Sequence, residues 1–145
     1  LFLPGMLAAG KGQILSTASF AGLASAPGIM TYGVAKAAVV ALSEQLRAEV
    51  FDKGILVGVI CPSFFKTNLI DTAVGSDKAR KMALRLMETS PDTVDTVADN
   101  VFASAERGQF MILPTKHEPM RWRMKRWFPN MYFRMLTKLV KQHTK

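Results

Sequence analysis

The run Ile55-Leu56-Val57-Gly58-Val59-Ile60 constrains the fold of this chain more than any other feature. A near-continuous apolar run of this length is typical of a parallel strand that is covered on both faces. Residues 13–17 predict a second strand, and between the two strands residues 32–51 carry alanine, valine and leucine at helical spacing. Strand, helix and strand in this order fit an α/β fold with a parallel sheet.

The predicted 32–51 helix has apolar residues on more than one side. We expect one stripe to face the sheet, formed by Ala35, Val39, Leu42, Leu46 and Val50. Ala38 and Ala41 lie on another side, which would be available to a partner helix. Further helices are predicted at 1–9, at 76–87 and after Ser90-Pro91, with Ser90 as N-cap and a core stripe of Val94, Val97, Ala98, Val101 and Phe102. Residues 19–31 are predicted to be a loop, residues 64–74 a loop or short helix, and residues 109–113 a final strand.

Charge separates the two ends of the chain. Residues 1–114 hold ten basic and ten acidic side chains, whereas residues 115–145 hold nine basic residues and one glutamate. The net charge of +8 is therefore carried by the C-terminal tail. The single cysteine, Cys61, excludes an internal disulfide, and neither histidine has the spacing of a zinc ligand, so no metal site is expected. No apolar run is long enough to span a bilayer, which makes the cytoplasm the default location.

Tyr32 and Lys36 stand four residues apart at the start of the predicted helix, and Ser19 lies thirteen residues before Tyr32. Residues at this spacing share one helix face, so the phenol and the ammonium would meet in one cleft. A free phenol has a pKa of about 10, and a nearby cation lowers it by stabilising the phenolate. The pair could then act in general acid–base catalysis, with the Ser19 hydroxyl bonding the same oxygen. A half-buried tyrosine beside a solvated lysine would give the same spacing.

The order of these motifs resembles the short-chain dehydrogenase/reductase family over residues 1–114. A strand leads to Ser19, the Tyr32–Lys36 motif opens a long helix, and Cys61-Pro62-Ser63 follows the next strand. The resemblance implies a partial Rossmann-like doubly wound parallel sheet over 1–114, followed by a basic amphipathic helical tail over 115–145. The family's glycine-rich TGxxxGxG turn and Asn-Ala-Gly motif do not occur here. We therefore expect the chain to be the C-terminal half of a longer enzyme and to be inactive by itself.

The resemblance implies hydride transfer between NAD or NADP and an alcohol or carbonyl substrate. Tyr32 would be the general acid/base, Lys36 would assist it and hold the nicotinamide ribose, and Ser19, rather than Ser16, would orient the substrate oxygen. The residues flanking the nicotinamide would be Pro62, Ser63 and Thr67, although Thr67 could equally cap a helix. The family usually has glycine where this chain has Ser63. An apolar substrate pocket, or ordinary core, would be formed by Phe64, Phe65, Leu69, Met82, Leu86 and Met87.

The resemblance and the composition of the tail predict two kinds of partner, a second copy of the chain and an anionic lipid surface. In the family, the helix corresponding to 32–51 builds a contact between subunits, which predicts a homo-oligomer. The tail mixes cations with aromatic side chains, namely Trp122, Trp127, Phe128, Tyr132 and Phe133, and this composition suits an anionic lipid surface. A non-catalytic membrane-surface or interaction module is therefore the alternative function, and a helix covering the substrate cleft or a partner subunit is a further role for the tail. Nucleic-acid binding is not expected, because no known nucleic-acid-binding motif accompanies the charge.

Overall fold

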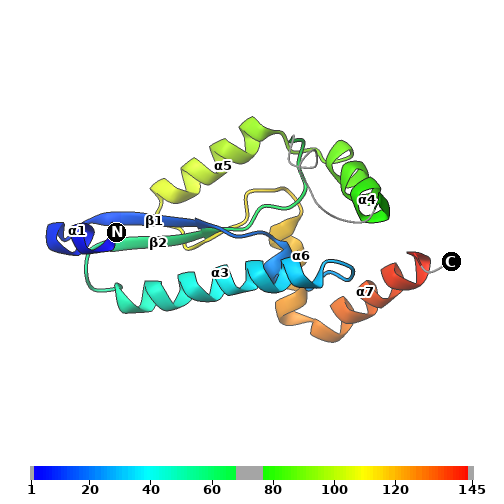
Figure 1. Cartoon of the computed structure of the whole chain (residues 1–145), viewed down its shortest axis with the longest axis horizontal. Coiled ribbons are helices and arrows are strands. Elements are labelled where there is room, and N and C mark those ends of the chain that lie inside the picture. The colour runs from blue at the N-terminus through cyan, green and yellow to red at the C-terminus, as the bar shows by residue number, and fades with distance from the viewer. Residues whose placement is uncertain (1, 68–76, 144–145) are drawn as a thin grey trace.

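The computed structural model describes residues 2–67 and 77–143 (Figure 1). Its strands are β1 (Gly12–Thr17), β2 (Ile55–Ile60) and β3 (Met111–Ile112). Its helices are α1 (Leu3–Ala9), α2 (Ala21–Ala24), α3 (Met30–Glu49), α4 (Asp77–Glu88), α5 (Val94–Glu106), α6 (Glu118–Trp127) and α7 (Pro129–His143). The predicted strands and the helices starting near residues 1, 32 and 76 are confirmed, whereas the predicted loop at 19–31 contains the short helix α2.

The three strands form one parallel sheet in the order β1-β2-β3. Gly12 pairs with Ile55 and Thr17 with Ile60, so β1 and β2 run side by side over their whole length. β3 pairs with β2 only through Met111 and Ile112. The carboxyl ends of β1 and β2 therefore lie together, which is where open α/β sheets bind ligands.

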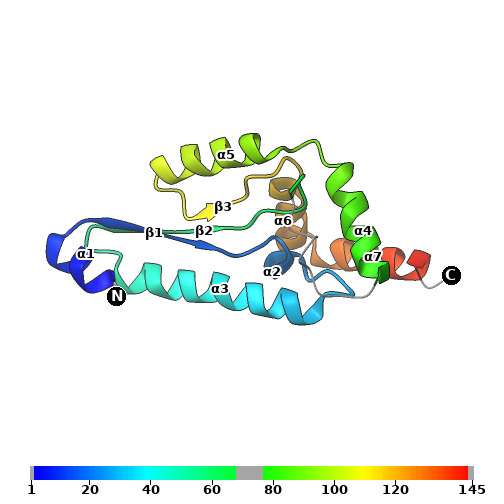
Figure 2. The same cartoon turned by 45° about the horizontal axis from the view of Figure 1, so that its top comes forward.

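Helices cover both faces of the sheet, as the β2 sequence predicts. α3 runs along one face and α5 lies over the other (Figure 2). In one core cluster, Val40 of α3 packs with Val59 of β2 and with Cys61, which directly follows β2. In a second cluster, Val50, at the end of α3, packs with Ile55 and Val57 of β2. On the α5 side, Gln13 of β1 donates a hydrogen bond from Nε2 to Ala105 O at 2.8 Å. These layers confirm the α/β architecture.

The sheet-facing side of α3 matches the predicted stripe in part, because Val39, Leu46 and Val50 pack in the core clusters. Val40, Ser43 and Val50 are buried, whereas Leu42 is 62% exposed and Ala35 is exposed. Successive residues of an α-helix are rotated by about 100°, so a line of contact shifted by one residue turns Leu42 away from the sheet. The predictions for Ala35 and Leu42 were therefore wrong.

The start of α5 also differs from its prediction. Thr93, not Ser90, is the N-cap, because its side chain accepts a hydrogen bond from Thr96 N while Thr96 Oγ1 accepts one from Thr93 N. Ser90 instead accepts a bond from Asp92 N. Only Val97 of the predicted stripe is buried, and Phe102 is 66% exposed. The Thr93–Thr96 pair satisfies two backbone N–H groups at once, which fixes the helix start three residues later than predicted.

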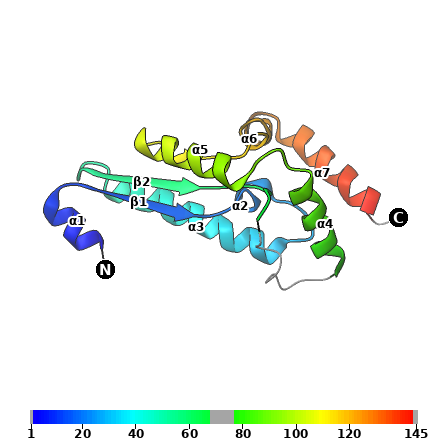
Figure 3. The same cartoon turned by 90° about the horizontal axis from the view of Figure 1, so that it is seen from above.

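The tail consists of α6 and α7, and the chain breaks between them at Phe128, just before Pro129. Figure 3 shows α6 near α2, at the carboxyl ends of the strands, and α7 leading away toward the C-terminus. Among the described residues, no helix is both long and apolar enough to cross a membrane. The division of the chain into units 1–114 and 115–145 stays a prediction.

Candidate active site

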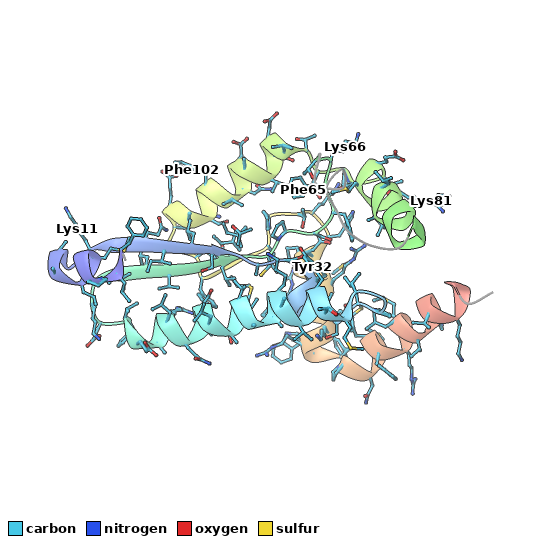
Figure 4. The ribbon with its side chains drawn as sticks, viewed as in Figure 1. Lys11, Tyr32, Phe65, Lys66, Lys81 and Phe102 are labelled. Atoms are coloured by element: carbon cyan, nitrogen blue, oxygen red, sulfur yellow. The ribbon has the colours of Figure 1, made fainter. Side chains whose placement is uncertain are left out.

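The predicted catalytic residues lie at the carboxyl end of the sheet. Ser19 follows β1, Pro62 and Ser63 follow β2, and Tyr32 and Lys36 lie in the first turns of α3. Figure 4 shows Tyr32 at the end of α3 that lies near these strand ends. Parallel strands and the helix that connects them thus gather residues that are far apart in the sequence.

Ser19 is held by the two strand ends and by α2. Its Oγ accepts a hydrogen bond from Ala21 N at 3.2 Å and donates one to Pro62 O at 3.5 Å. Phe20 N also donates to Pro62 O, at 2.8 Å. Ser19 is therefore fixed at the point where β1 and β2 end, whereas Ser16 lies inside β1 opposite Val59.

Tyr32 and Lys36 lie on one face of α3, as their spacing predicts. Lys36 Nζ is 5.8 Å from the centroid of the Tyr32 ring and donates a hydrogen bond to Thr17 O at 3.2 Å. The Lys36 amine therefore points back to the end of β1. Tyr32 is 46% exposed, so its phenol is accessible to a small molecule.

Gly22 lets α2 approach α3 closely. A Cβ on Gly22 would lie 2.7 Å from the backbone C of Lys36 and from the N of Ala37. Only a residue without a side chain allows two backbones to come this near. α2 therefore fills the space between Ser19, which precedes it, and the turn of α3 that carries Lys36.

The proposed nicotinamide-flanking residues lie in the segment that follows β2, with Pro62 and Ser63 adjacent and Thr67 four residues further along the chain. Pro62 O accepts the bond from Ser19, and Ser63 N donates to Thr115 Oγ1 at 3.3 Å. Thr67 lines a pocket of about 510 Å³, together with Lys66, Leu84, Met87, Glu88 and Val94. None of Ser19, Tyr32 and Lys36 is among the lining residues of this pocket. Figure 4 likewise places Lys66 on the α4 side of the strand ends, away from Tyr32.

The family follows from comparison with known proteins. The family model described as short chain dehydrogenase matches residues 1–78, more than half of the chain, and this stretch includes Ser19, Tyr32 and Lys36. The chain belongs to the short-chain dehydrogenase/reductase family.

Relatives in this family match nearly the whole chain. Dehydrogenase/reductase SDR family member 7B of Rattus norvegicus is 30% identical over 144 residues, which are 99% of this chain and 44% of the relative. A short-chain dehydrogenase/reductase from Burkholderia phymatum, solved in complex with NAD, has a TM-score of 0.74 and 25% identity and covers 90% of this chain and 52% of its own. A short-chain dehydrogenase from Sphingobium yanoikuyae, solved in complex with NADPH, has a TM-score of 0.66 and 27% identity, over 83% of this chain and 44% of its own. The chain thus spans about half the length of these short-chain dehydrogenases.

The candidate substrate-lining residues differ in burial and in whether they line the pocket. Met87 is buried and lines the pocket beside Thr67, whereas Phe64 and Leu86 are exposed. Leu69 and the Met82 side chain lie outside the described part of the structure. Met87 is therefore the one candidate among the described side chains that lines the pocket.

Cys61 is buried at the end of β2, close to the catalytic candidates. Burial raises the pKa of its thiol to about 11, against smaller opposing effects of a backbone hydrogen bond with Ser19 and the charge of Lys36. The thiol is therefore protonated at neutral pH and acts as a small apolar core group. Among the described residues, no cluster of histidine, cysteine or carboxylate side chains could hold a metal ion.

The sequence did not reveal four residues that lie in or beside this candidate site. Gly22 is one of ten glycines, and nothing in its neighbourhood in the chain marks it for close packing against α3. Thr115, Lys125 and Tyr132 come from the C-terminal quarter and reach Ser63, Leu23 and Ala24 by hydrogen bonds. Their one sequence signal is the tail's mixture of aromatic and basic residues, which pointed to a lipid surface instead.

Proposed function

We propose that this chain carries the proton-transfer site of an NAD- or NADP-dependent oxidoreductase that interconverts an alcohol and a carbonyl compound. The observation that carries the proposal is the placement of Tyr32. Its accessible ring lies 5.8 Å from Lys36 Nζ at the start of α3, near the strand end that carries Ser19. The bound NAD and NADPH in the solved relatives support a nicotinamide cofactor.

Each residue has a role that its position allows. The Tyr32 hydroxyl exchanges a proton with the substrate oxygen, and Lys36 places a positive charge 5.8 Å from the centre of the Tyr32 ring. Ser19 holds the substrate oxygen by donating its single hydroxyl hydrogen, which leaves the long 3.5 Å bond to Pro62 O, while the bond from Ala21 N keeps Oγ in place. A nicotinamide cofactor supplies or accepts the hydride. The residues of this chain proposed to contact it are Tyr32, Lys36, Pro62, Ser63 and Thr67.

The test is a hydride-transfer assay on the intact protein that contains this chain. NADH and NADPH are titrated separately by fluorescence, and turnover of a panel of alcohols and ketones is followed by nicotinamide absorbance. We expect one cofactor to bind and at least one ketone or alcohol to be turned over. No binding of either cofactor would refute the proposal.

The tail supports a second candidate function, contact with an anionic membrane. Trp127 is 76% exposed, and Phe128, Met131 and Phe133 beside it are exposed as well. Exposed basic side chains, Arg123, Arg126 and Arg134, lie on the same two helices. The prediction that all the tail aromatics face the lipid was wrong for Tyr132, which is buried and donates a hydrogen bond to Ala24 O.

For this second function we expect replacement of Trp127 and Phe133 by glutamine to reduce sedimentation with anionic vesicles. Each lost aromatic anchor weakens insertion, and each cation near the surface contributes on the order of 1 kcal/mol. Binding of the unsubstituted protein should fall as salt is raised. Phe102→Gln, at an exposed position on α5, is the matched control. Equal sedimentation of all three proteins would exclude the membrane role.

We also propose that α3 joins two subunits. The face turned away from the sheet carries apolar Val34, Ala38, Ala41 and Leu42, all exposed in the single chain. Leu42→Glu should therefore shift the intact protein from dimer to monomer in sedimentation velocity, because it places a charge in an apolar contact. Phe102→Glu, on the other side of the sheet, should leave the association state unchanged. A dimer that tolerates Leu42→Glu would contradict this assignment.

A further inference from the structure

α2 depends on its surroundings for its stability. A helix of four residues, Ala21–Ala24, is far too short to be stable by itself in water. Its last carbonyl groups have no partners within the helix. It is followed by Ser25, whose φ of 53° lies in the left-handed region that a residue other than glycine adopts only at a cost. Contacts from elsewhere must therefore hold this end of α2.

The tail supplies these contacts from about a hundred residues further along the chain. Lys125 Nζ donates hydrogen bonds to Leu23 O and, at 2.8 Å, to Ser25 Oγ. Tyr132 Oη donates to Ala24 O at 2.8 Å. The ammonium also carries the charge that the carbonyl end of a helix favours. Two tail residues thus donate hydrogen bonds to the last carbonyl groups of α2, and one of them also bonds the side chain of Ser25.

Both donors are withdrawn from water to make these bonds. Tyr132 is only 5% exposed, and Lys125 is half-buried. Burial lowers the pKa of Lys125 and raises the pKa of Tyr132, the latter against a smaller opposing effect of Arg121. Buried polar groups are retained where hydrogen bonds satisfy them, so Tyr132 belongs to the folded core of the tail, while Lys125 stays partly open to solvent.

The other end of α2 is joined to the catalytic candidates. Ser19 Oγ accepts the bond from Ala21 N, and Gly22 packs against the backbone of Lys36 and Ala37. Gly33, in the first turn of α3, also lies close to α2, because a Cβ on Gly33 would be 3.4 Å from Ala21 O. A shift of α2 would therefore move Ser19 relative to the turn that carries Tyr32 and Lys36.

We propose that Lys125 and Tyr132 are positioning residues: the tail holds the carbonyl end of α2 and thereby fixes Ser19 relative to Tyr32 and Lys36. The proposal rests on the proposed catalytic roles of those three residues. It assigns the tail a part in turnover that is separate from any contact with a membrane. Residues of a reacting site need to be held within about 1 Å, because larger displacements cost on the order of a hundredfold in rate.

The test compares Lys125→Met and Tyr132→Phe with Lys138→Met, which removes an exposed lysine from the same tail. In the intact protein we expect kcat to fall about tenfold in the first two variants, with KM for the cofactor changed by less than about twofold. Lys125→Arg, which keeps a cationic donor, should recover part of the loss. Lys138→Met should match the unsubstituted protein.

A second measurement does not depend on activity. Hydrogen exchange of the α2 amides, which bond to Ser19 O and Phe20 O, should be faster in Lys125→Met and Tyr132→Phe than in Lys138→Met. Tyr132→Phe removes a single oxygen, so it keeps the test valid if Lys125→Met fails to fold. Unchanged exchange and unchanged kcat in both variants would overturn the proposal. If the unsubstituted protein itself showed no hydride transfer, the proposed function would fail, and the exchange rates alone would decide whether the tail holds α2.

Discussion

Replacing Tyr32 by phenylalanine should lower kcat of the intact protein by about 10²- to 10⁴-fold, the usual contribution of general acid–base catalysis. Phenylalanine keeps the ring at the start of α3 and removes only the hydroxyl. Because Lys36 Nζ bonds Thr17 O and does not depend on the phenol for its position, cofactor binding should be nearly unchanged. Steady-state kinetics and a fluorescence titration with NADH or NADPH measure the two effects separately.

Thr31→Val is the matched control for this substitution. Thr31 precedes Tyr32 on the exposed side of α3, and the change removes a hydroxyl one residue away. Its kcat should stay within about threefold of the original, in line with the small effects of most surface substitutions. Near-normal turnover by Tyr32→Phe would remove Tyr32 from the mechanism, and an equal loss in both variants would show that the effect is one of local structure.

Gly22→Ala should destabilise the protein and reduce its turnover together. Alanine in a helix normally gains about 0.5–1 kcal/mol over glycine. Here the added Cβ would lie 2.7 Å from backbone atoms of Lys36 and Ala37, which cannot turn aside as a side chain can. Overpacking costs about 1–3 kcal/mol, so the net effect is a loss of stability. α2 must also move away from α3, and kcat should fall at least about tenfold.

Gly5→Ala provides the comparison, because Gly5 lies within α1 and a Cβ there would meet no atom within 4 Å. This variant should be as stable as the original protein or slightly more so, with normal turnover. Thermal unfolding followed by circular dichroism, together with steady-state kinetics, measures both quantities. If Gly22→Ala behaved like Gly5→Ala, the close contact between α2 and α3 would not exist in solution.

Local patterns were enough to predict most of the scaffold. The apolar run at 55–60 gave β2, because a strand covered on both faces has no need of polar residues. The break in the tail was predictable for an equally local reason, since proline lacks an N–H group and disfavours helix in the residue before it. The four-residue spacing of Tyr32 and Lys36 likewise implied one shared helix face.

The predictions of the buried side of α3 and of the N-cap of α5 were less accurate. Helical periodicity predicted the core contacts of Val39, Leu46 and Val50 on α3, but it did not show that Leu42 would be exposed. At α5, both Ser90 and Thr93 are acceptable caps by type, and only the bonds actually made distinguish them. Bonds within residues 90–96 decide the α5 cap, whereas packing against the sheet decides which apolar residues of α3 are buried.

The sequence by itself determined the strands, the long helix, the excess charge of the tail and the Ser19, Tyr32 and Lys36 candidates. The strands, the helix and the charge follow from residue type and near-neighbour spacing, whereas the three candidate residues also rested on the resemblance to the short-chain dehydrogenase/reductase family. Only the tertiary structure decided that Tyr132 is buried and that Lys125 reaches the carbonyl end of α2. Contacts between residues a hundred positions apart leave no local pattern, because either partner would look the same on an exposed helix. Which tail side chains bond α2 and which face solvent is decided only when α6 and α7 pack beside α2.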